Sequence, residues 1–270
     1  MTSPVNAIAL KSIRNPRTSG WRPLPFPPSI CPRTFAHSHP HLPARTDDAV
    51  STRRPQRSTP PAEALAHLRA ADPILSAAID AVGPIEMAVE PDLWWGLVDS
   101  IISQQVSVKA AWAIIGRVAA LGAAGRPTPA EVAAMEVDVL RAAGLSRAKV
   151  RYVKDLAARW TDGSLPHGRI AAMTDDEVIA ELTKVKGIGV WTAEMILIFT
   201  LARPDVLPVD DLGIRNAVQR LYGLPERPGR DELLRISQPW RPHRSLASRY
   251  LWRVASTTPA IAPPPDSPAA

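Results

Sequence analysis

Cysteine is almost absent from this chain of 270 residues. The only one, Cys31, cannot form an internal disulfide, which fits a protein kept in a reducing compartment. One cysteine also excludes a cluster of iron and sulfur held by four cysteines. We therefore expect a cytoplasmic protein whose fold depends on packing and hydrogen bonds, without disulfides or an iron–sulfur cofactor.

Long apolar runs and several well-known site motifs are missing too. No apolar run approaches the ~20 residues that cross a bilayer, so we expect no membrane association through a spanning helix. A phosphate-binding Walker loop and a nucleophile elbow are both absent. The histidines outside residues 1–60 stand far apart, so no metal site built from side chains is predicted.

Positive charge is unevenly distributed. The chain has 32 Lys and Arg against 26 Asp and Glu, a net charge of +6. Residues 1–60 hold nine of the basic and two of the acidic residues, which leaves 23 basic and 24 acidic residues in the other 210. A face that binds nucleic acid would therefore have to be local. The candidate cations for it are Lys184, Lys186, Arg241, Arg244 and Arg249.

Composition divides the chain into three parts. Residues 1–60 are rich in Pro, Ser, Thr and Arg and show no periodicity, so we expect a disordered basic tail. Residues 61–256 have apolar positions at helical spacing and form the predicted folded domain. Residues 257–270 are rich in Pro and Ala, and we expect a second disordered tail there.

Signals for the start of a helix recur through the central part. Thr128-Pro129-Ala-Glu131 and Thr174-Asp-Asp-Glu177 have the spacing of a capping box, and Asp92 and Ser107 can cap two further helices. We find no pair of alternating, strand-like runs joined by a hairpin turn. The sequence therefore predicts an all-α domain.

The most informative stretch lies around Gly187 and Gly189, between two predicted helices. Glycine permits positive φ and lets the backbone approach a partner closely. The N–H groups at the start of the second helix lack partners within the helix, so they form an anion site that a DNA phosphate can occupy. Further along, Pro208-Val-Asp210-Asp211-Leu-Gly places a carboxylate at the start of another helix.

Four segments in this order resemble one protein family. They are Ile101-Ile-Ser-Gln104-Gln105-Val-Ser107, Gly187-Ile188-Gly189-Val-Trp191-Thr192-Ala193, the segment that contains Asp210 and Asp211, and Trp240 to Trp252. They are similar to the helix-hairpin-helix base-excision DNA glycosylases, and among these to the 3-methyladenine DNA glycosylase II type. The resemblance implies two helical subdomains that flank a groove for DNA and the active site.

The resemblance assigns the catalytic carboxylate to Asp211, with Asp210 as the alternative. Cleavage of an N-glycosidic bond develops positive charge on the sugar, which a nearby carboxylate stabilises while it orients a water molecule. An aspartate at this position can also be only a helix cap, which is the commoner use of the residue.

Three residues are expected to bind the damaged base. The resemblance places Trp191 and Trp252 beside the base pocket, and Met195 stands where family members often have an aromatic residue. An indole face attracts a cationic, methylated purine more than a neutral one. Bifunctional relatives have a lysine in place of Trp191, so the covalent Schiff-base route is closed here. The alternative is that these side chains pack in the core.

The expected DNA contacts lie in two segments: Lys186, Gly187, Ile188, Gly189 and Thr192 in the hairpin, and Gln104 and Gln105. The glutamines can instead cap a helix and be buried with satisfied amides. The family resemblance also implies that a sodium or potassium ion can bind main-chain carbonyls of the hairpin. The loop from Leu121 to Arg126 is a candidate for the wedge that fills the space left by a flipped nucleotide.

The resemblance therefore implies a monofunctional glycosylase that removes alkylated purines from duplex DNA at a bacterial-type nucleoid and acts as a monomer. One alternative is a glycosylase for deaminated or oxidised bases, against which the missing lysine and cysteine cluster argue. Another is a helix-hairpin-helix module that binds DNA without catalysis. Such a module needs Gly187 and Gly189 but has no use for Asp211 and Trp191 together.

Overall fold

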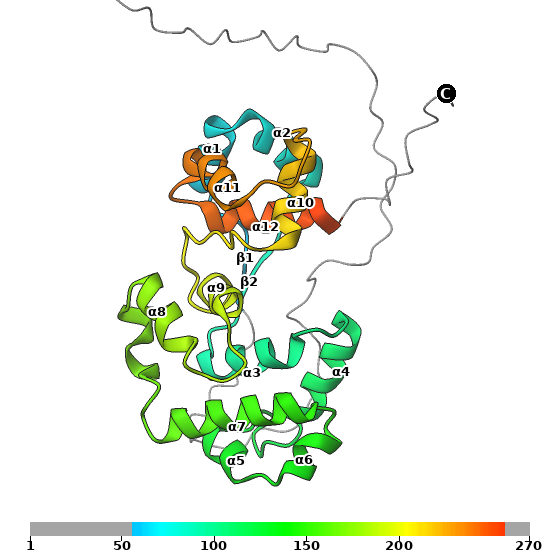
Figure 1. The fold of residues 1–270 in the computed structure, drawn as a ribbon, viewed down its shortest axis with the longest axis vertical. Helices are drawn as coiled ribbons and strands as arrows, with labels where there is room; N and C mark the ends of the chain where they lie inside the picture. Colours follow the sequence, from blue (N-terminus) through cyan, green and yellow to red (C-terminus); the bar gives the residue numbers. More distant parts are fainter. Residues whose placement is uncertain (1–55, 257–270) are drawn as a thin grey trace, which may run out of the picture. The chain divides into compact units, whose positions relative to one another are not determined.

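The computed structural model describes residues 56–256, which are mostly helical (Figure 1). Residues 1–55, with Cys31, and residues 257–270 lie outside the described part, and so do most of the two predicted tails. No helix in the described part is long and apolar enough to cross a membrane. The elements are β1 (Gln56–Ser58), α1 (Ala62–Ala71), α2 (Pro73–Val82), β2 (Met87–Val89), α3 (Leu93–Ser103), α4 (Val108–Ala119), α5 (Pro129–Ala134), α6 (Val137–Ala142), α7 (Arg147–Thr161), a 3₁₀ helix (His167–Ala172), α8 (Asp175–Leu182), α9 (Val190–Phe199), α10 (Leu212–Leu221), α11 (Arg230–Ile236), a second 3₁₀ helix (Gln238–Trp240) and α12 (Arg244–Ser256).

Two short strands depart from the sequence prediction. β1 pairs with β2 in antiparallel register, with Gln56 opposite Val89 and Ser58 opposite Met87. Three residues are too few to show the alternation that identifies a strand in a sequence. β1 also lies within residues 1–60, which we assigned to the tail, so regular structure extends back to Gln56.

The predicted helix starts are confirmed by their hydrogen bonds. Thr128 and Thr174 each form a complete capping box with the glutamate three residues later. The side chain of Asp92 accepts a main-chain N–H bond at the start of α3, and that of Ser107 accepts one at the start of α4. These local bonds satisfy amides that a helix cannot pair internally, which is why they are readable from sequence.

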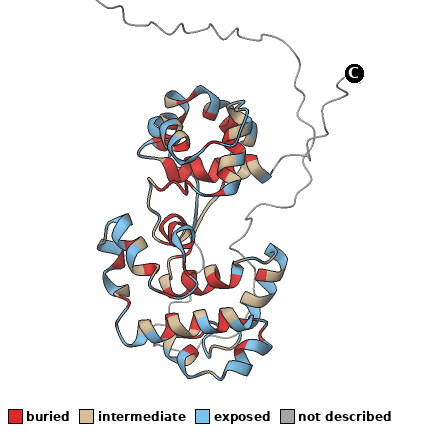
Figure 2. Ribbon diagram, viewed as in Figure 1, coloured by how far each residue is buried: buried red, intermediate tan, exposed pale blue. Residues whose placement is uncertain are grey.

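Two hydrophobic clusters form the interior of the described part. The first draws on α3, α7, α8 and α9, and the second on α2, α10 and α12 together with α1. α12 packs on α2 and α10, so the last helix shares a cluster with the first ones. Figure 2 shows that much of α12 is buried. Trp252 on α12 contacts both clusters, which places this helix at their junction.

Candidate active site and nucleic-acid interface

The start of α10 carries the candidate catalytic carboxylate. Asp211 is the N-cap residue of this helix, and its Oδ1 accepts the main-chain N–H of Ile214 at 2.8 Å. Two indole N–H groups complete the set, because Trp252 donates to Oδ1 at 3.0 Å and Trp191 donates to Oδ2 at 2.8 Å. Asp211 is only 9% exposed. Three donors, from α9, α10 and α12, therefore fix the orientation of this carboxylate.

The neighbouring Asp210 has a different environment. Its side chain is 71% exposed and pairs with Arg230 at 3.1 Å. The indole N–H groups of Trp191 and Trp252 donate to Asp211 and not to Asp210. The structure thus separates the two adjacent carboxylates that the sequence left as rivals, and only Asp211 is held beside Trp191 and Trp252.

The three residues expected to bind the base differ in exposure and in their contacts. Trp191 is 46% exposed, so its N–H is engaged by Asp211 while much of its ring stays accessible. Trp252 is half-buried and stacks on Phe199 with ring centroids 5.6 Å apart. Met195 is half-buried one turn after Trp191 and packs against the first cluster. Trp191 and Trp252 therefore both contact Asp211. Met195 shares helix α9 with Trp191.

Sequence reasoning missed a second acidic residue near this carboxylate. Glu194 is 9% exposed on α9, three residues after Trp191 and therefore on a neighbouring part of the same helix face. Burial raises the pKa of Glu194 to about 7, and the negative charges of Asp210 and Asp211 add to this while Arg230 opposes it. An acidic residue inside the apolar run of α9 was the signal that could have revealed it.

Of the two glycines in the turn between α8 and α9, Gly187 has positive φ, whereas Gly189 has φ −95°. Gly187 adopts φ +83°, and a Cβ there would lie 2.2 Å from the ring of Tyr152 on α7, so no other residue fits without displacement. Gly189 is the N-cap residue of α9, and no side chain caps this helix. The first N–H groups of α9 are thus the part of the hairpin suited to a phosphate.

Not every predicted hairpin contact can use its side chain. Ile188 is 4% exposed and belongs to the first cluster, so it can meet DNA only through its main chain. Thr192 is 5% exposed, and its hydroxyl lies 3.4 Å from Gln104 Nε2. The Lys186 side chain is 69% exposed and pairs with Asp155 at 3.2 Å, so it is accessible at the hairpin surface.

The two glutamines differ in their roles. Gln104 Nε2 donates to the main-chain carbonyl of Gly187 at 2.8 Å, which joins the end of α3 to the hairpin. Gln105 is exposed and has φ +54°, one of two non-glycine residues with positive φ in the described part. Such backbone costs on the order of 1–3 kcal/mol and is concentrated at functional sites. Gln104 therefore supports the hairpin, and Gln105 presents its side chain to solvent beside it.

The structure does not test the sodium or potassium ion that the resemblance implies for the hairpin. The carbonyl of Gly187 already accepts a bond from Gln104, and that of Val185 accepts the N–H of Ile188 at 3.1 Å. These contacts do not point to a cation, and its presence stays a prediction. Within residues 56–256, no group of three or more His, Cys, Asp or Glu could hold a metal ion.

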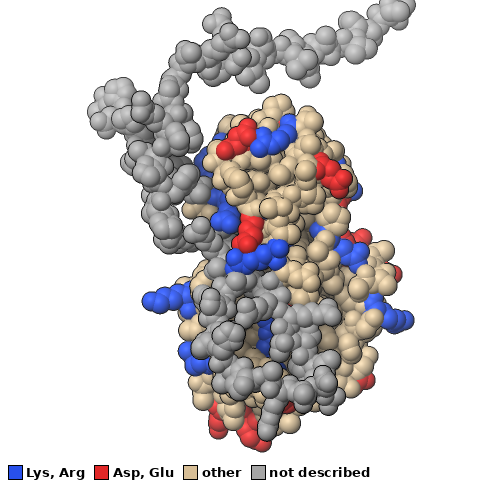
Figure 3. Space-filling view, turned by 180° about the vertical axis from the view of Figure 1, so that it is seen from behind, with Lys and Arg blue, Asp and Glu red and all other residues tan. Residues whose placement is uncertain are grey.

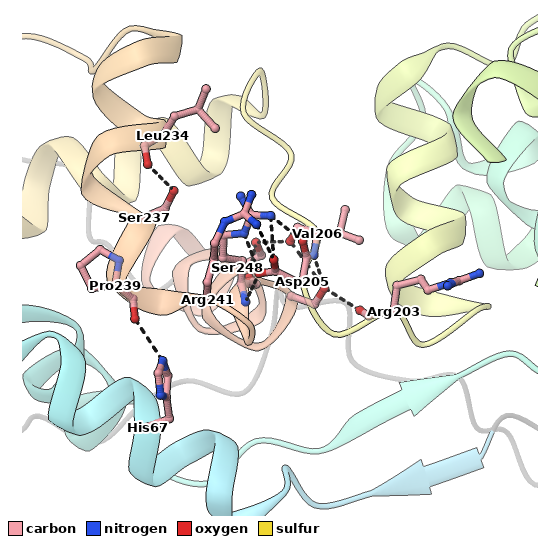
Figure 4. A network of polar contacts seen from close by, with 11 residues as sticks. His67, Arg203, Asp205, Val206, Leu234, Ser237, Pro239, Arg241 and Ser248 are labelled. Atoms are coloured by element: carbon pink, nitrogen blue, oxygen red, sulfur yellow. Dashed lines mark hydrogen bonds and ion pairs between the residues drawn. The ribbon is translucent and has the colours of Figure 1, made fainter. Parts of the chain in front are cut away.

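Two arginines expected at a local basic face have structural roles instead. Arg244 is 8% exposed and binds Asp205 through Nε at 2.6 Å and Nη2 at 2.9 Å. Arg249, also 8% exposed, lies over the ring of Phe199 at 4.3 Å. Arg241 pairs with Asp205 as well, at 3.4 Å (Figure 4). On the face drawn in Figure 3, basic and acidic side chains are interspersed.

The loop proposed as a wedge is held at both of its ends. Leu121 packs against the first cluster, and Arg126 makes two bonds with the buried Glu90, at 3.1 and 3.2 Å. The four residues between them are glycines and alanines. The structure shows no large side chain of this loop free for intercalation, and its role as a wedge stays a prediction.

Known proteins similar to this chain include DNA glycosylases. DNA-3-methyladenine glycosylase 1 from Schizosaccharomyces pombe is 40% identical over 161 residues, which cover 59% of this chain and 71% of that protein. A solved structure of the S. pombe 3-methyladenine DNA glycosylase in complex with abasic DNA matches with a TM-score of 0.62 and 35% identity, covering 71% of this chain and 95% of that one. A solved structure of a DNA-3-methyladenine glycosidase from Bacillus halodurans matches with a TM-score of 0.67 and 34% identity, covering 75% of this chain and 93% of that one.

The family itself follows from the extent of the match. The model of the HhH-GPD superfamily of base excision DNA repair proteins matches residues 98–242. This span contains the α3 end, the glycine hairpin and Asp211, while Trp252 lies just beyond it. With its helical fold and the indole-held carboxylate at the start of α10, this chain belongs to the HhH-GPD superfamily of base excision DNA repair proteins.

Proposed function

We propose that this chain is a monofunctional DNA glycosylase that hydrolyses the N-glycosidic bond of alkylated purines, such as 3-methyladenine and 7-methylguanine, in duplex DNA during base excision repair. The observation that carries the proposal is the Asp211 carboxylate, held by two indole N–H groups beside the exposed ring of Trp191. The names of the relatives support it, and so does the neighbour bound to abasic DNA.

Asp211 acts on the sugar in this mechanism. As the bond to the base breaks, positive charge develops on the deoxyribose, and a carboxylate fixed nearby stabilises that charge without having to reorganise. The same carboxylate can orient the attacking water. Its three N–H donors hold the Asp211 carboxylate in place, so its orientation is preorganised before the substrate binds.

Trp191 provides the surface for the base. An alkylated purine carries a positive charge, and the face of an indole attracts such a cation by roughly 0.5–2 kcal/mol. The charge also makes the base a good leaving group, so a site without a dedicated general acid suffices. Because position 191 has an indole rather than an amine, it cannot form a Schiff base with the sugar.

The hairpin binds the DNA backbone in this proposal. The uncapped N–H groups at the start of α9 face a phosphate, and Lys186 adds a nearby positive charge. The target nucleotide must leave the stack before its sugar can reach Asp211, at a cost of a few kcal/mol that is smaller for a damaged base. Because Trp191 follows the hairpin directly on α9, phosphate binding and base binding share one rigid element.

Release of free methylated bases from alkylated duplex DNA tests the proposal. The wild-type chain should release 3-methyladenine and leave an abasic site in an unbroken strand, and Asp211→Asn should not. If the wild type binds DNA but releases nothing from alkylated, deaminated or oxidised duplexes, the chain is a binding module instead. If it releases only deaminated or oxidised bases, the substrate class is wrong and the enzyme class stands.

We further propose that the chain acts as a monomer on DNA of a bacterial-type nucleoid. The carboxylate, both indoles and the hairpin all come from a single chain, so the site does not require a second copy. Light scattering of the free chain and of its complex with a short duplex measures the stoichiometry. A complex that contains two chains for each damaged site would contradict the monomer.

A further inference from the structure

Helix α7 carries two lysines that each bind the carboxyl end of another helix. Lys149 Nζ donates to the main-chain carbonyls of Ile102 and Gln104, both at 2.7 Å, at the end of α3. Lys154 Nζ donates to the carbonyl of Ala133 at 3.0 Å and to that of Met135, at the end of α5. The last carbonyls of a helix have no partner within it and attract a positive charge, so both lysines occupy favourable positions.

Lys149 is the more deeply placed of the two. It is 9% exposed, and burial lowers the pKa of its ammonium group. Within residues 56–256 no carboxylate pairs with it, and its hydrogen bonds go to the two carbonyls. A buried ammonium group costs free energy unless it is well bonded. Through these two carbonyls, the ammonium group of Lys149 contacts the turn that follows α3.

The turn after α3 contains Gln105, the residue with positive φ described above. Lys149 binds the carbonyl of Gln104, and the next residue, Gln105, adopts φ +54°. The Gln104 side chain then reaches the carbonyl of Gly187 in the hairpin at 2.8 Å. The turn is thus fastened by Lys149 on the α7 side and by Gln104 on the hairpin side, which fixes the direction in which Gln105 points.

The hairpin is attached to the same helix. Asp155 on α7 accepts the main-chain N–H of Lys186 at 3.0 Å, and its other oxygen pairs with Lys186 Nζ at 3.2 Å. The ring of Tyr152, also on α7, lies against Gly187. One helix therefore sets the positions of two neighbouring turns, the Gln104–Gln105 turn through Lys149 and the glycine hairpin through Tyr152 and Asp155.

We propose that Lys149 is a positioning residue for DNA engagement, which holds the Gln104–Gln105 turn in register with the glycine hairpin so that both turns meet one DNA duplex together. The inference rests on the proposed function, in which the hairpin contacts DNA. Lys149 itself touches no DNA in this arrangement, because its ammonium group is enclosed by the carbonyls that it binds. Its effect passes through the backbone of Gln104 and Gln105.

The full chain with Lys149→Met tests the inference, and Lys154→Met is its matched control. Both variants lose one positive charge from α7 and leave two helix-end carbonyls without a cation, so their general electrostatic effects are alike, and any difference in stability is measured separately. The affinity for a duplex that contains a stable abasic-site analogue is measured beside unfolding in urea. K149M should bind about ten- to a hundredfold more weakly, since a displaced contact can cost that much, while K154M stays within about twofold.

Rescue and a milder variant complete the test. Lys149→Arg keeps a cation that can bind two carbonyls, so it should recover affinity to within a few-fold of wild type. If K149M does not fold, Lys149→Gln and Lys154→Gln replace the methionine pair, because an amide still donates to one carbonyl. Equal losses of DNA affinity in the matched pair would overturn the inference and leave Lys149 with a purely structural role.

The outcome also separates this inference from the proposed function. DNA binding is measured without base release, so a wild-type chain that binds the duplex but releases no base refutes the glycosylase while the comparison of Lys149 with Lys154 still stands. A wild-type chain that releases bases, with K149M binding and acting as K154M does, refutes the inference alone. Single-turnover release at saturating enzyme adds a further readout, because a positioning role for binding changes the apparent affinity more than the maximal rate.

Discussion

Two aspartates of this chain have the same local chemistry and different surroundings. Asp72 is the N-cap of α2 and Asp211 the N-cap of α10, and each accepts main-chain N–H bonds from its own helix. Each also accepts an indole N–H, from Trp240 at 2.8 Å in one case and from Trp191 and Trp252 in the other. They are 7% and 9% exposed. Neither burial nor hydrogen bonding alone identifies a catalytic carboxylate.

The difference lies in what surrounds the bonded oxygens. Asp72 is enclosed by Trp240, which is fully buried, and by the hydroxyl of Tyr222, whose pKa is raised by burial and by this bond. Asp211 instead binds an indole that is 46% exposed and follows the glycine hairpin. The exposed ring of Trp191 therefore lies beside Asp211, while Asp72 is enclosed by residues of the second cluster. The same cap is structural in one place and suited to catalysis in the other.

The largest expected effect is on activity at Asp211. Asp211→Asn removes the negative charge that we propose stabilises the sugar, and base release should fall by about 10²- to 10³-fold or more. Single-turnover release of 3-methyladenine measures it. Asp210→Asn, which removes an exposed ion pair with Arg230 and one of the charges that act on Glu194, is the matched control and should stay within a few-fold of wild type. Full activity in the Asp211 variant with loss in the Asp210 variant would reverse our assignment.

Trp191→Phe separates the two roles of the indole. An aromatic face is kept, although it is smaller than that of indole, but the N–H that holds Asp211 is lost. A hydrogen bond to a charged group contributes roughly 1.5–3 kcal/mol, so the rate should fall by about ten- to a hundredfold while binding of the base changes less. The maximal single-turnover rate and the half-saturating enzyme concentration distinguish these effects. A change in binding alone would mean that the N–H bond does not serve catalysis.

Asp72→Asn should affect stability rather than chemistry. Trp240 and Tyr222 both donate to Oδ2, so an amide nitrogen at that position leaves the buried indole N–H of Trp240 without an acceptor, which costs about 1–3 kcal/mol. Urea unfolding should show this loss, while activity per folded molecule stays near that of wild type. A specific loss of activity at full stability would contradict the contrast between the two aspartates.

Glu194→Gln gives a smaller effect that depends on pH. Between pH about 4.5 and about 7 the folded chain holds the Glu194 proton more tightly than the unfolded chain does, because burial and the carboxylates of Asp210 and Asp211 outweigh Arg230. The stability that this proton confers is present at low pH and is lost as pH rises through the folded pKa. The glutamine variant should therefore gain about 1–2 kcal/mol over wild type on going from about pH 5 to about pH 8. Parallel stability curves at the two pH values would show that Glu194 is more solvated than the structure indicates.

Several features of the site were predictable from the residues. Glycine at 187 and 189 permits positive φ, and the structure uses this freedom at Gly187 but not at Gly189. A carboxylate at the start of a helix was expected at Asp211, and it caps α10. The capping boxes at Thr128 and Thr174 were predictable, because their hydrogen bonds join residues only three apart in the sequence. Such features depend on local geometry, which a sequence carries directly.

Other features required contacts between distant parts of the chain. Sequence reasoning could not show that Gln104 binds Gly187 across 83 residues or that Lys149 holds the Gln104–Gln105 turn. It also misassigned β1, whose partner lies about thirty residues away, and it assigned Arg244 and Arg249 to a basic face although both are buried.

The sequence by itself therefore determined the helices, their caps, the hairpin and the family resemblance, because these follow from short-range periodicity and from motifs in fixed order. Only the tertiary structure decided which of Asp210 and Asp211 is held by the indoles, and that Glu194 lies near them. Adjacent residues have almost the same sequence context, but α9 and α12 pack against one side of the α10 start. The side chain on that side is buried among donors, while its neighbour remains in solvent.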